Sequence, residues 1–445
     1  MSDSTVQGVL VLARHGDRQG FYQDPTTYTA SATSITPLGN VQEQQLGALL
    51  RSMYLNASSP DWIAGVNPTI FTDSQVLVRA DGSDEGGVIV DSALSLLAGL
   101  WPPTTAWNTT LANGTTVVGP FNGYQYVPLQ TINADEDISL EGNTQCNTWA
   151  NSNTAFYNSS GFLQVANESA AFLSLLPPFL DGRPVTLQNM VFDYMNVQSI
   201  HNKTFFDRLP PTFLAQARAL ANYHEYGIFT SPQLNGIGNV VGQAILPTMF
   251  SALNRISNSS DPLKLAYNAI SYKPFLSLFN MTGVAQSNPE LAGVVNYAAS
   301  VVFEVRTSNA SSEPLLRFRF KNGTDDAEYT TFNLFGSNGD IPLSQFINTL
   351  TPAGINNTQE WCGICNNSVN RGCAAFAAQS ALPTSAAHSG SHVSAVGAGF
   401  IGAGVTLALM AVILAVLAFG GLLTLFPRRR KGGSVRITSC RLVQC

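Results

Sequence analysis

The apolar run Val9–Ala13 leads directly into the charged sequence Arg14-His15-Gly16-Asp17-Arg18, and this junction is the strongest constraint on how the chain folds. An uninterrupted apolar run without polar alternation is typical of a strand that is buried on both faces of a sheet. The charged residues after it then lie at the carboxyl end of a central strand. In open α/β sheets, ligands bind at that edge.

Strand-like and helix-like segments alternate after this junction. The spacing of apolar residues predicts a helix over Val41–Tyr54, a strand over Val76–Val78 and a helix over Val88–Leu100. This alternation indicates the α/β class, with a mostly parallel central sheet and helices on both of its faces. The core resumes near Leu263, and two later runs predict a hairpin, Val294–Val305 and Leu315–Phe320.

The charged sequence itself has the chemistry of a phosphate site. A neutral imidazole is a nitrogen nucleophile, and a guanidinium group offers a planar fork of donors that matches phosphate oxygens. His15 between Arg14 and Arg18 therefore predicts in-line attack on a bound phosphoryl group. The net charge of −6 leaves no basic stripe along the chain, so we do not expect nucleic acid as a partner.

Further segments extend this motif into a recognisable pattern. Residues 14–18 resemble the Arg-His-Gly signature of the histidine acid phosphatases, in the phosphoglycerate-mutase-like superfamily. Other matching segments are Thr36-Pro37-Leu38-Gly39, Ser92-Ala93, Leu96 through Trp101-Pro102-Pro103, and Ser199-Ile200-His201-Asn202-Lys203. The resemblance implies a phosphoglycerate-mutase-like core with a smaller helical cap over residues 120–235. Helices expected in that cap are Glu168–Leu175 and Pro211–Tyr226.

The resemblance also assigns roles to residues. It makes His15 the catalytic nucleophile, which forms a phosphohistidine that water hydrolyses, and it makes Arg14 and Arg18 phosphate ligands. Arg79 follows the second strand and is expected to bind phosphate or to brace the strand end. His201 lies in a segment that the family uses structurally, so we assign it no chemistry. The expected substrate is a phosphorylated small molecule, and we expect neither a cofactor nor a metal.

Two departures from the family pattern affect catalysis. The position of the family's central arginine falls near Val88, and the acidic loop of residues 80–87 contains no arginine. The family's His-Asp pair, which supplies the acid for the leaving group, aligns with Ile270-Ser271. A general acid contributes about 10²–10⁴-fold in rate. Candidate substitutes are Asp81, Asp84 and Glu85, with Lys273 restoring positive charge, whereas His224-Glu225 is expected to be a solvated or core-edge helix position.

Two functions therefore compete. The complete cluster of His15 with its two arginines favours a membrane-anchored phosphomonoesterase with altered general-acid chemistry. Ile270-Ser271 and the missing central arginine favour a catalytically inactive pseudophosphatase that binds a phosphorylated ligand at the cell surface. A phosphoglycerate mutase is a poorer hypothesis, because those enzymes are cytosolic and carry no membrane span. We expect residual enzyme activity.

The C-terminal part of the chain predicts a membrane anchor. Ile401–Phe426 is almost wholly apolar and is long enough to span a bilayer, which takes about 20 residues. The basic cluster Arg428-Arg429-Arg430-Lys431 follows it and places the tail in the cytosol. The expected organisation is a phosphatase-like domain over 1–375, an Ala/Ser-rich stalk over 376–394, a transmembrane helix over 395–426 and a cytosolic tail over 427–445.

Acceptor sequences for N-linked glycans are dense. Twelve Asn-x-Ser/Thr sequons favour a domain outside the cytosol, in the secretory pathway or at the cell surface, as a single-pass membrane protein with N-linked glycans. Residues 1–7 contain no apolar signal region, so either the true N-terminus is missing or the protein is tail-anchored with its domain in the cytosol. The sequons favour the first explanation.

Four cysteines lie outside the predicted membrane span, at positions 146, 362, 365 and 373. An even number fits two disulfides in an oxidising compartment, and three pairings are possible. Cys362 and Cys365 also have zinc-like spacing, but no histidine lies nearby and only one further thiol follows. We therefore expect disulfides rather than zinc.

Overall fold

The computed structural model describes residues 4–19, 33–82, 86–189, 191–309 and 311–381. The predicted stalk from residue 382 onward, the transmembrane helix and the tail lie outside these residues. Residues 376–381, where the stalk was expected to begin, belong to α14 (Cys373–Ala381). Within the described ranges, no helix combines the length and apolarity that crossing a membrane requires.

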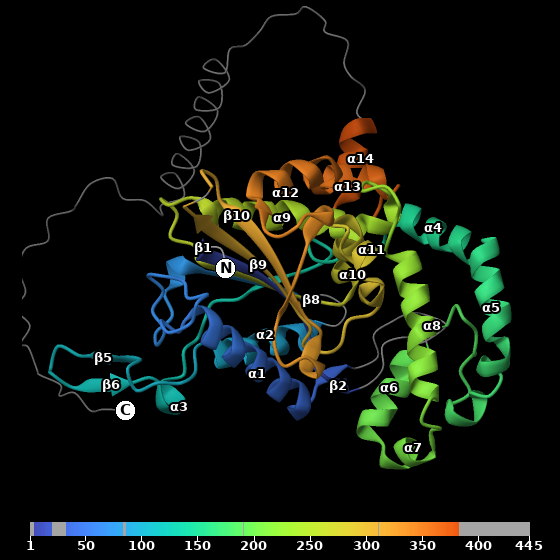
Figure 1. Cartoon of the computed structure of the whole chain (residues 1–445), viewed down its shortest axis with the longest axis horizontal. Coiled ribbons are helices and arrows are strands. Elements are labelled where there is room, and N and C mark those ends of the chain that lie inside the picture. The colour runs from blue at the N-terminus through green and yellow to red at the C-terminus, as the bar shows by residue number, and fades with distance from the viewer. Residues whose placement is uncertain (1–3, 20–32, 83–85, 190, 310, 382–445) are drawn as a thin grey trace, which may run out of the picture. The chain divides into compact units, whose positions relative to one another are not determined.

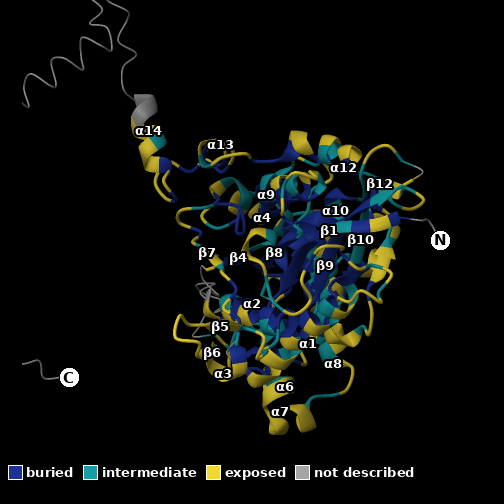
Figure 2. Ribbon diagram, turned by 90° about the vertical axis from the view of Figure 1, so that its left-hand side faces the viewer, coloured by how far each residue is buried: buried dark blue, intermediate teal, exposed yellow. Residues whose placement is uncertain are grey.

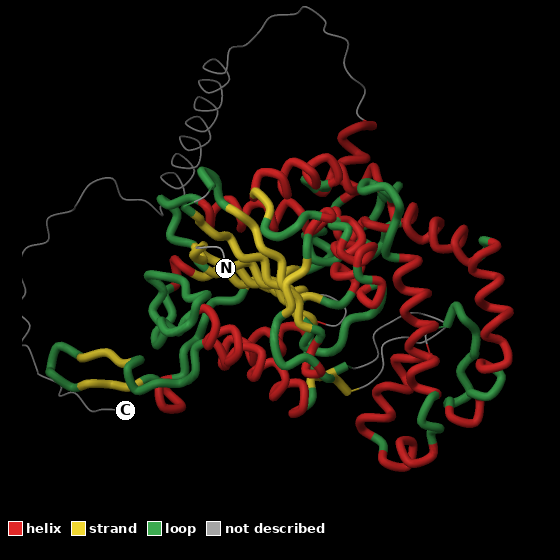
Figure 3. Tube along the Cα trace, in the orientation of Figure 1, coloured by secondary structure: helices red, strands yellow, loops and turns green. Residues whose placement is uncertain are grey.

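A mixed sheet with the order β11-β10-β9-β1-β8-β4-β7 forms the centre, and β12 pairs with β10 (Figures 1 and 3). The strands β1, β8, β4 and β7 are parallel, whereas β9, β10 and β11 run antiparallel to their neighbours. The strand bounds are β1 Ser4–Arg14, β2 Arg18–Gln19, β3 Ser34–Ile35, β4 Val76–Asp81, β5 Asn108–Thr110, β6 Thr116–Val118, β7 Gln130–Ile132, β8 Leu265–Ile270, β9 Ser300–Ser308, β10 Leu315–Lys321, β11 Thr330–Phe332 and β12 Ile341–Pro342.

Helices cover both faces of the sheet, and a further helical group lies to one side of it (Figure 1). This group comprises α4 to α8. The helix bounds are α1 Pro37–Tyr54, α2 Gly86–Leu100, α3 Pro120–Gly123, α4 Asn147–Tyr157, α5 Ser160–Leu173, α6 Val191–His201, α7 Lys203–Arg208, α8 Phe213–Ile228, α9 Val240–Ser257, α10 Lys273–Met281, α11 Val284–Ser287, α12 Leu343–Leu350, α13 Thr358–Ile364 and α14.

Strand β1 is buried on both faces, as the apolar run predicts (Figure 2). Val9, Val11 and Ala13 pack in one core cluster with residues of α1 and α2. Leu10 and Leu12 point to the opposite face, where they pack with residues of α9 and α10. Since successive side chains of a strand alternate between faces, a run that is wholly apolar joins two core layers.

The predicted elements of the core are confirmed, with shifted ends. Strand β4 continues to Asp81, and α1 begins at Pro37 behind Thr36, whose hydroxyl accepts a hydrogen bond from the Gly39 amide at 3.0 Å. The late hairpin is present as β9 and β10, but residues 294–299 are not strand. Ala298 has a left-handed φ of 54°, which interrupts extended backbone before β9 begins.

The cysteines form two disulfides, Cys146–Cys365 and Cys362–Cys373. The first joins the N-terminal cap of α4 to the end of α13, and the second joins α13 to α14. This agrees with the expected disulfides and selects one of the three pairings. Among the residues that the structure describes, no group of three or more His, Cys, Asp or Glu side chains is arranged to hold a metal ion.

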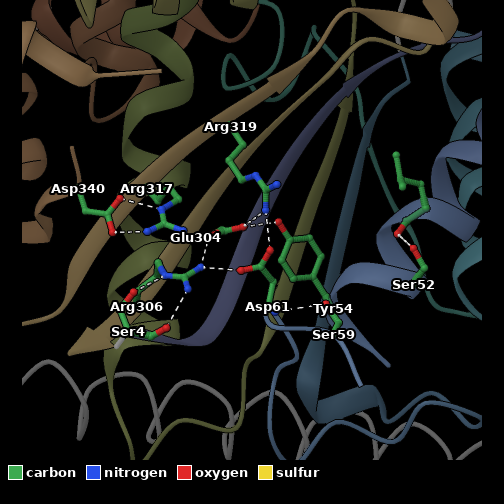
Figure 4. Close-up of polar contacts among 11 residues, drawn as sticks. Ser4, Ser52, Tyr54, Ser59, Asp61, Glu304, Arg306, Arg317, Arg319 and Asp340 are labelled. Carbon is green, nitrogen blue, oxygen red and sulfur yellow. Dashed lines mark hydrogen bonds and ion pairs between the residues drawn. The ribbon is translucent and has the colours of Figure 1, made fainter. Parts of the chain in front are cut away.

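A buried ionic network lies at the amino end of β1, away from the charged signature (Figure 4). Glu304 is fully buried and accepts hydrogen bonds from Tyr54 at 2.7 Å, from Arg319 at 3.0 Å and from Arg306 at 2.5 Å. Asp61 bridges the same two arginines. Although burial raises the pKa of Asp61, these hydrogen bonds hold it below its ordinary value. The network ties α1 to β9 and β10.

Glu43 on α1 is a buried acid of a different kind. Its side chain is fully buried, and neither carboxyl oxygen has a hydrogen-bond partner among the residues that the structure describes. Burial raises its pKa well above the ordinary value, so the folded protein holds it protonated. The unfolded chain ionises near pH 4.3. The contribution of Glu43 to the free energy of unfolding is therefore fully present below about pH 4.3. It decreases as pH rises from there to the pKa of Glu43 in the folded protein.

We predict that Glu43→Gln is more stable than the wild type at pH 8 and that this advantage shrinks toward pH 4.5, because glutamine does not ionise. Denaturant unfolding at the two pH values measures the difference in the free energy of unfolding between the variant and the wild type. The pH effects of all other groups cancel in this difference, because both proteins contain them. A stability difference that is the same at both pH values would contradict a protonated Glu43.

Candidate functional site

The signature residues 14–18 leave β1 and pass directly against the start of α1. Gly16 is required there, because a Cβ at this position would lie 2.6 Å from the Gly39 carbonyl oxygen. A Cβ on Gly39 would lie 2.2 Å from the Asp17 carbonyl oxygen. The Gly16 amide also donates to the Ser92 hydroxyl of α2 at 3.1 Å. The two helices that the sequence predicted therefore hold the signature loop from one side.

Asp17 fixes the loop from within. Its side chain is fully buried, and Oδ2 accepts a hydrogen bond from the Thr36 hydroxyl at 2.5 Å. Nε2 of His201, at the end of α6, lies 2.8 Å from the same oxygen. The sequence assigned His201 no chemistry. Its position makes it a contact between the signature and the helical group α4–α8.

His15 has a defined ring orientation. Its Nδ1 lies 2.8 Å from the Gly16 carbonyl oxygen, and a carbonyl only accepts, so Nδ1 is the donor. A neutral ring then carries its lone pair on Nε2, which is the nucleophilic nitrogen. The imidazole is 1% exposed, and its centroid lies 5.6 Å from that of Tyr297. His15 itself is not among the described residues that line the adjacent cavity.

Arg14 and Arg18 both line a cavity of about 200 Å³ between the core and α6 and α8. Arg14 donates to the Val295 carbonyl, and its guanidinium lies over the rings of Tyr297 at 4.7 Å and Tyr272 at 5.3 Å. Arg18 donates to both carboxylate oxygens of Asp193 at 3.0 Å. The two arginines of the predicted cluster therefore share one cavity, and Arg18 is already paired with the α6 carboxylate of Asp193.

A third arginine completes the cavity. Arg218 on α8 lines it and donates to the Val294 carbonyl at 2.9 Å. Burial lowers the pKa of Arg218, and the neighbouring positive charge of Arg14 lowers it further. The cavity also contains Asp193 and Asp325, so three guanidinium groups face two carboxylates. This excess of positive charge favours an anionic ligand.

Tyr297 contributes a neutral donor to the same cavity wall. Its hydroxyl is buried and has no hydrogen-bond partner among the described residues. Burial raises the pKa of Tyr297 to about 12, against the lowering effect of Arg18, so the phenol stays protonated at physiological pH. A buried hydroxyl without a partner is costly, and a bound oxyanion would supply the missing acceptor.

Arg79 is not among the described residues that line this cavity, and its contacts fit the bracing role, the second of the two roles expected for it. The parallel register of β4 with β8 pairs Arg79 with Asn268, two residues before Ile270. The residue at the end of β4 is Asp81, not Arg79. Its side chain forms an ion pair with Asp137 at 2.8 Å and donates to the Ser139 and Thr248 hydroxyls. Arg79 therefore stabilises the middle of the strand rather than the ligand edge.

The two departures seen in the sequence lie beside the signature. Parallel register places Ile270 directly opposite Arg14, and Val88 at the start of α2 is fully buried. Neither side chain can transfer a proton or bind phosphate. Asp81 is buried at the end of β4, whereas Asp84 and Glu85 lie outside the described residues.

His224 and Glu225 are buried, so a solvated position for them was wrong, while the core-edge alternative fits. His224 Nδ1 lies 2.8 Å from Glu225 Oε1, and the Tyr272 hydroxyl donates to Oε2 at 2.5 Å. The pair thus reaches the wall of the arginine cavity through Tyr272.

Signals in the sequence were weak for three residues of the cavity wall. Tyr272 follows Ile270-Ser271 directly, and Arg218 lies in the predicted cap helix. Tyr297 fell within a predicted strand.

Comparison with known proteins places this arrangement in a family. The model of the histidine phosphatase superfamily, branch 2, matches residues 19–321, which is more than half of the chain and begins just after the signature. A comparison with curated protein sequences finds no match.

Solved structures with a similar fold include three bacterial phytases. The phytase of Citrobacter braakii is 14% identical with a TM-score of 0.56, over 81% of this chain and 99% of that one. The phytase of Klebsiella sp ASR1 is 13% identical with a TM-score of 0.54, over 79% and 97%. The apo phytase of Hafnia alvei is 13% identical with a TM-score of 0.52, over 81% and 98%. At these identities the likeness concerns the fold alone.

We predict that Arg218→Ala weakens binding of inorganic phosphate about tenfold or more, because a hydrogen bond to a charged group contributes about 1.5–3 kcal/mol. Arg79→Ala is the matched control and should leave phosphate affinity unchanged. Isothermal titration calorimetry measures both. Equal losses in the two variants would mean that the cavity at Arg14 is not where phosphate binds.

Proposed function

Because the chain belongs to branch 2 of the histidine phosphatase superfamily, we propose that it hydrolyses phosphomonoesters of small molecules through a phosphohistidine at His15. The observation that carries the proposal is the orientation of His15, whose Nδ1 is committed to the Gly16 carbonyl beside a cavity with Arg14 and Arg18. That arrangement supports nucleophilic attack by Nε2 on a phosphoryl group held by guanidinium donors.

The proposed reaction has two steps, phosphorylation of His15 and hydrolysis of the phosphohistidine. The Nε2 lone pair of His15 forms a bond to phosphorus as the ester P–O bond breaks and the alcohol oxygen leaves with the bonding electrons. Water then attacks phosphorus, and the P–N bond breaks with its electron pair returning to Nε2, which restores the neutral imidazole. Inorganic phosphate departs with one proton of the water, and the other proton passes to solvent or to the released alkoxide. Arg14, Arg18 and Arg218 stabilise the phosphoryl oxygens, and the Tyr297 hydroxyl donates a further hydrogen bond.

The leaving group receives little help from the residues that replace the family pair. Ile270 is apolar, and a serine hydroxyl is too weak an acid to protonate an alkoxide efficiently. The proposed enzyme therefore depends on electrostatic stabilisation of the phosphoryl group. Esters whose alcohol departs as a stable anion react under these conditions, whereas alkyl esters require a proton.

We predict that nitrophenyl phosphate is cleaved on the order of 10²-fold or more faster than glycerol phosphate, which is the usual contribution of a general acid. Replacing Ile270-Ser271 by His-Asp should narrow this ratio. His15→Ala should abolish turnover of both esters. Steady-state kinetics with the two substrates measures the ratio, and activity that survives in His15→Ala would remove the phosphohistidine mechanism. Equal wild-type rates would mean that another residue acts as the acid.

The alternative is a pseudophosphatase that binds a phosphorylated ligand without turnover. It is favoured by the 1% exposure of His15 and by the apolar residues Val88 and Ile270 at two positions where the family has catalytic groups. Phosphate binding to the wild type without turnover of either ester would establish this function in place of hydrolysis.

We further propose that the chain is a glycosylated, single-pass membrane protein whose phosphatase-like domain faces the exterior. Supporting this, ten of the twelve sequon asparagines are exposed in the structure, and the other two, Asn280 and Asn322, are half-buried. Asn280 donates from its amide to the Ser231 carbonyl at 2.8 Å, so a glycan there would break an internal hydrogen bond.

We predict that glycosidase treatment of the native protein lowers its apparent mass by many kilodaltons and that peptide mapping finds Asn280 unmodified. Asn113 and Asn167, which are both exposed, are the matched positive sites. An unchanged mass, together with protease sensitivity from the cytosolic side, would establish the tail-anchored alternative.

A further inference from the structure

A second cavity of about 420 Å³ lies on the other side of Tyr272, whose side chain lines both cavities. Its walls come from the segment of residues 141–145, from α4 and α8, and from the start of α10. The volume falls within the range of small-molecule sites, roughly 300–1,000 Å³. The chemistry of its walls differs from that of the arginine cavity.

Several amide side chains line this cavity. Asn143 and Asn153 are each 8% exposed, and Gln145 lies beside them along the wall. The Asn143 Oδ1 atom is buried and has no hydrogen-bond partner in the described part of the chain. Buried amide groups normally have partners, so these side chains are matched to a ligand with several hydroxyl groups, each of which donates and accepts.

Aromatic rings form the rest of the wall in two stacked pairs. Trp149 stacks on Phe229 with centroids 5.1 Å apart, and its Nε1 donates to the Ile228 carbonyl, which fixes the indole plane. Tyr157 stacks on His224 at 5.4 Å. Flat apolar faces beside amide groups suit a ring that carries C–H groups on its faces and hydroxyls at its edge.

The charged groups of this cavity are paired with one another. Lys273 donates to Glu141 at 3.4 Å, and His224 contacts Glu225 at 2.8 Å. No arginine is among its described lining residues. The cavity therefore has no excess of positive charge, and a polyanionic ligand would be repelled by the two carboxylates.

We propose that this cavity binds a neutral sugar or a similar neutral polyol. In the intact substrate, this polyol would be the alcohol part of a phosphomonoester whose phosphoryl group occupies the arginine cavity across Tyr272. The second statement rests on the proposed function, whereas polyol binding stands on the walls of this cavity alone.

Calorimetric titration of the purified full chain, in a detergent without a sugar headgroup, tests the proposal. The probes are neutral methyl glycosides and myo-inositol, with glucuronate and inositol hexakisphosphate as charged counterparts. Saturable binding of a neutral probe is expected. Asn153→Ala should weaken it about tenfold, because a ligand hydrogen bond to a buried amide is lost. Asn151→Ala, an exposed position on the same helix, is the matched control and should leave binding unchanged.

Two further variants keep the result interpretable. Arg14→Ala should retain binding of the neutral probe even though it disrupts the arginine cavity, so a failure of the proposed hydrolysis would leave this test intact. Gln145→Ala, on an exposed side chain, replaces Asn153→Ala should the latter unfold at a lower temperature than the wild type. Absence of saturable binding by every neutral probe would overturn the proposal. So would binding that neither cavity variant weakens, or a preference for inositol hexakisphosphate in the Arg14→Ala protein.

Discussion

Backbone pairing of β1 with β8 on one side and β9 on the other determines where the chemistry of this protein lies. Parallel register sets Arg14 opposite Ile270, and antiparallel register sets Ser300, the first residue of β9, opposite Ala13. The Arg14 amide donates to the Ala299 carbonyl at 2.8 Å, and the Ala298 amide donates to the His15 carbonyl at 3.1 Å. These bonds place the loop before β9, with Tyr297, beside His15.

The helices then hold that edge in place. Gly16 and Gly39 allow α1 to touch the signature backbone, and Asp17 links the loop to His201 on α6. Arg18 links it to the same helix through Asp193. The helical group therefore does more than cover the site, since Asp193 on α6 neutralises Arg18 and α8 supplies a further arginine, Arg218. Under the proposed function, a phosphate that binds Arg18 would compete with Asp193 for its guanidinium group.

Much of the core was predictable because it rests on apolar periodicity. The fully buried β1, the amphipathic α1 and the α2 helix each follow from local patterns that the tertiary structure reinforces. The strand ends were less predictable. The charge of Arg79 suggested that β4 ends there, but pairing with β7 extends the strand to Asp81, and Arg79 forms an ion pair with Asp137.

The site was predictable only where one segment carries it. His15, Arg14 and Arg18 are adjacent in sequence, whereas Arg218 and Tyr297 join them through contacts between distant segments. Tyr297 lies in a run that reads as strand, and the left-handed backbone at Ala298 is not encoded by a glycine. The pairing of His224 and Glu225 with Tyr272 was likewise invisible, because helix periodicity gives a face but not the neighbour that covers it.

The central claim is that His15 becomes phosphorylated. Rapid mixing of the purified protein with radiolabelled nitrophenyl phosphate, quenched in alkali because phosphohistidine is acid-labile, traps the intermediate for peptide mapping. The account predicts label on the peptide that contains His15 in the wild type and no label in His15→Ala. Label on another residue, or a burst of nitrophenol release without any trapped phosphoenzyme, would contradict it.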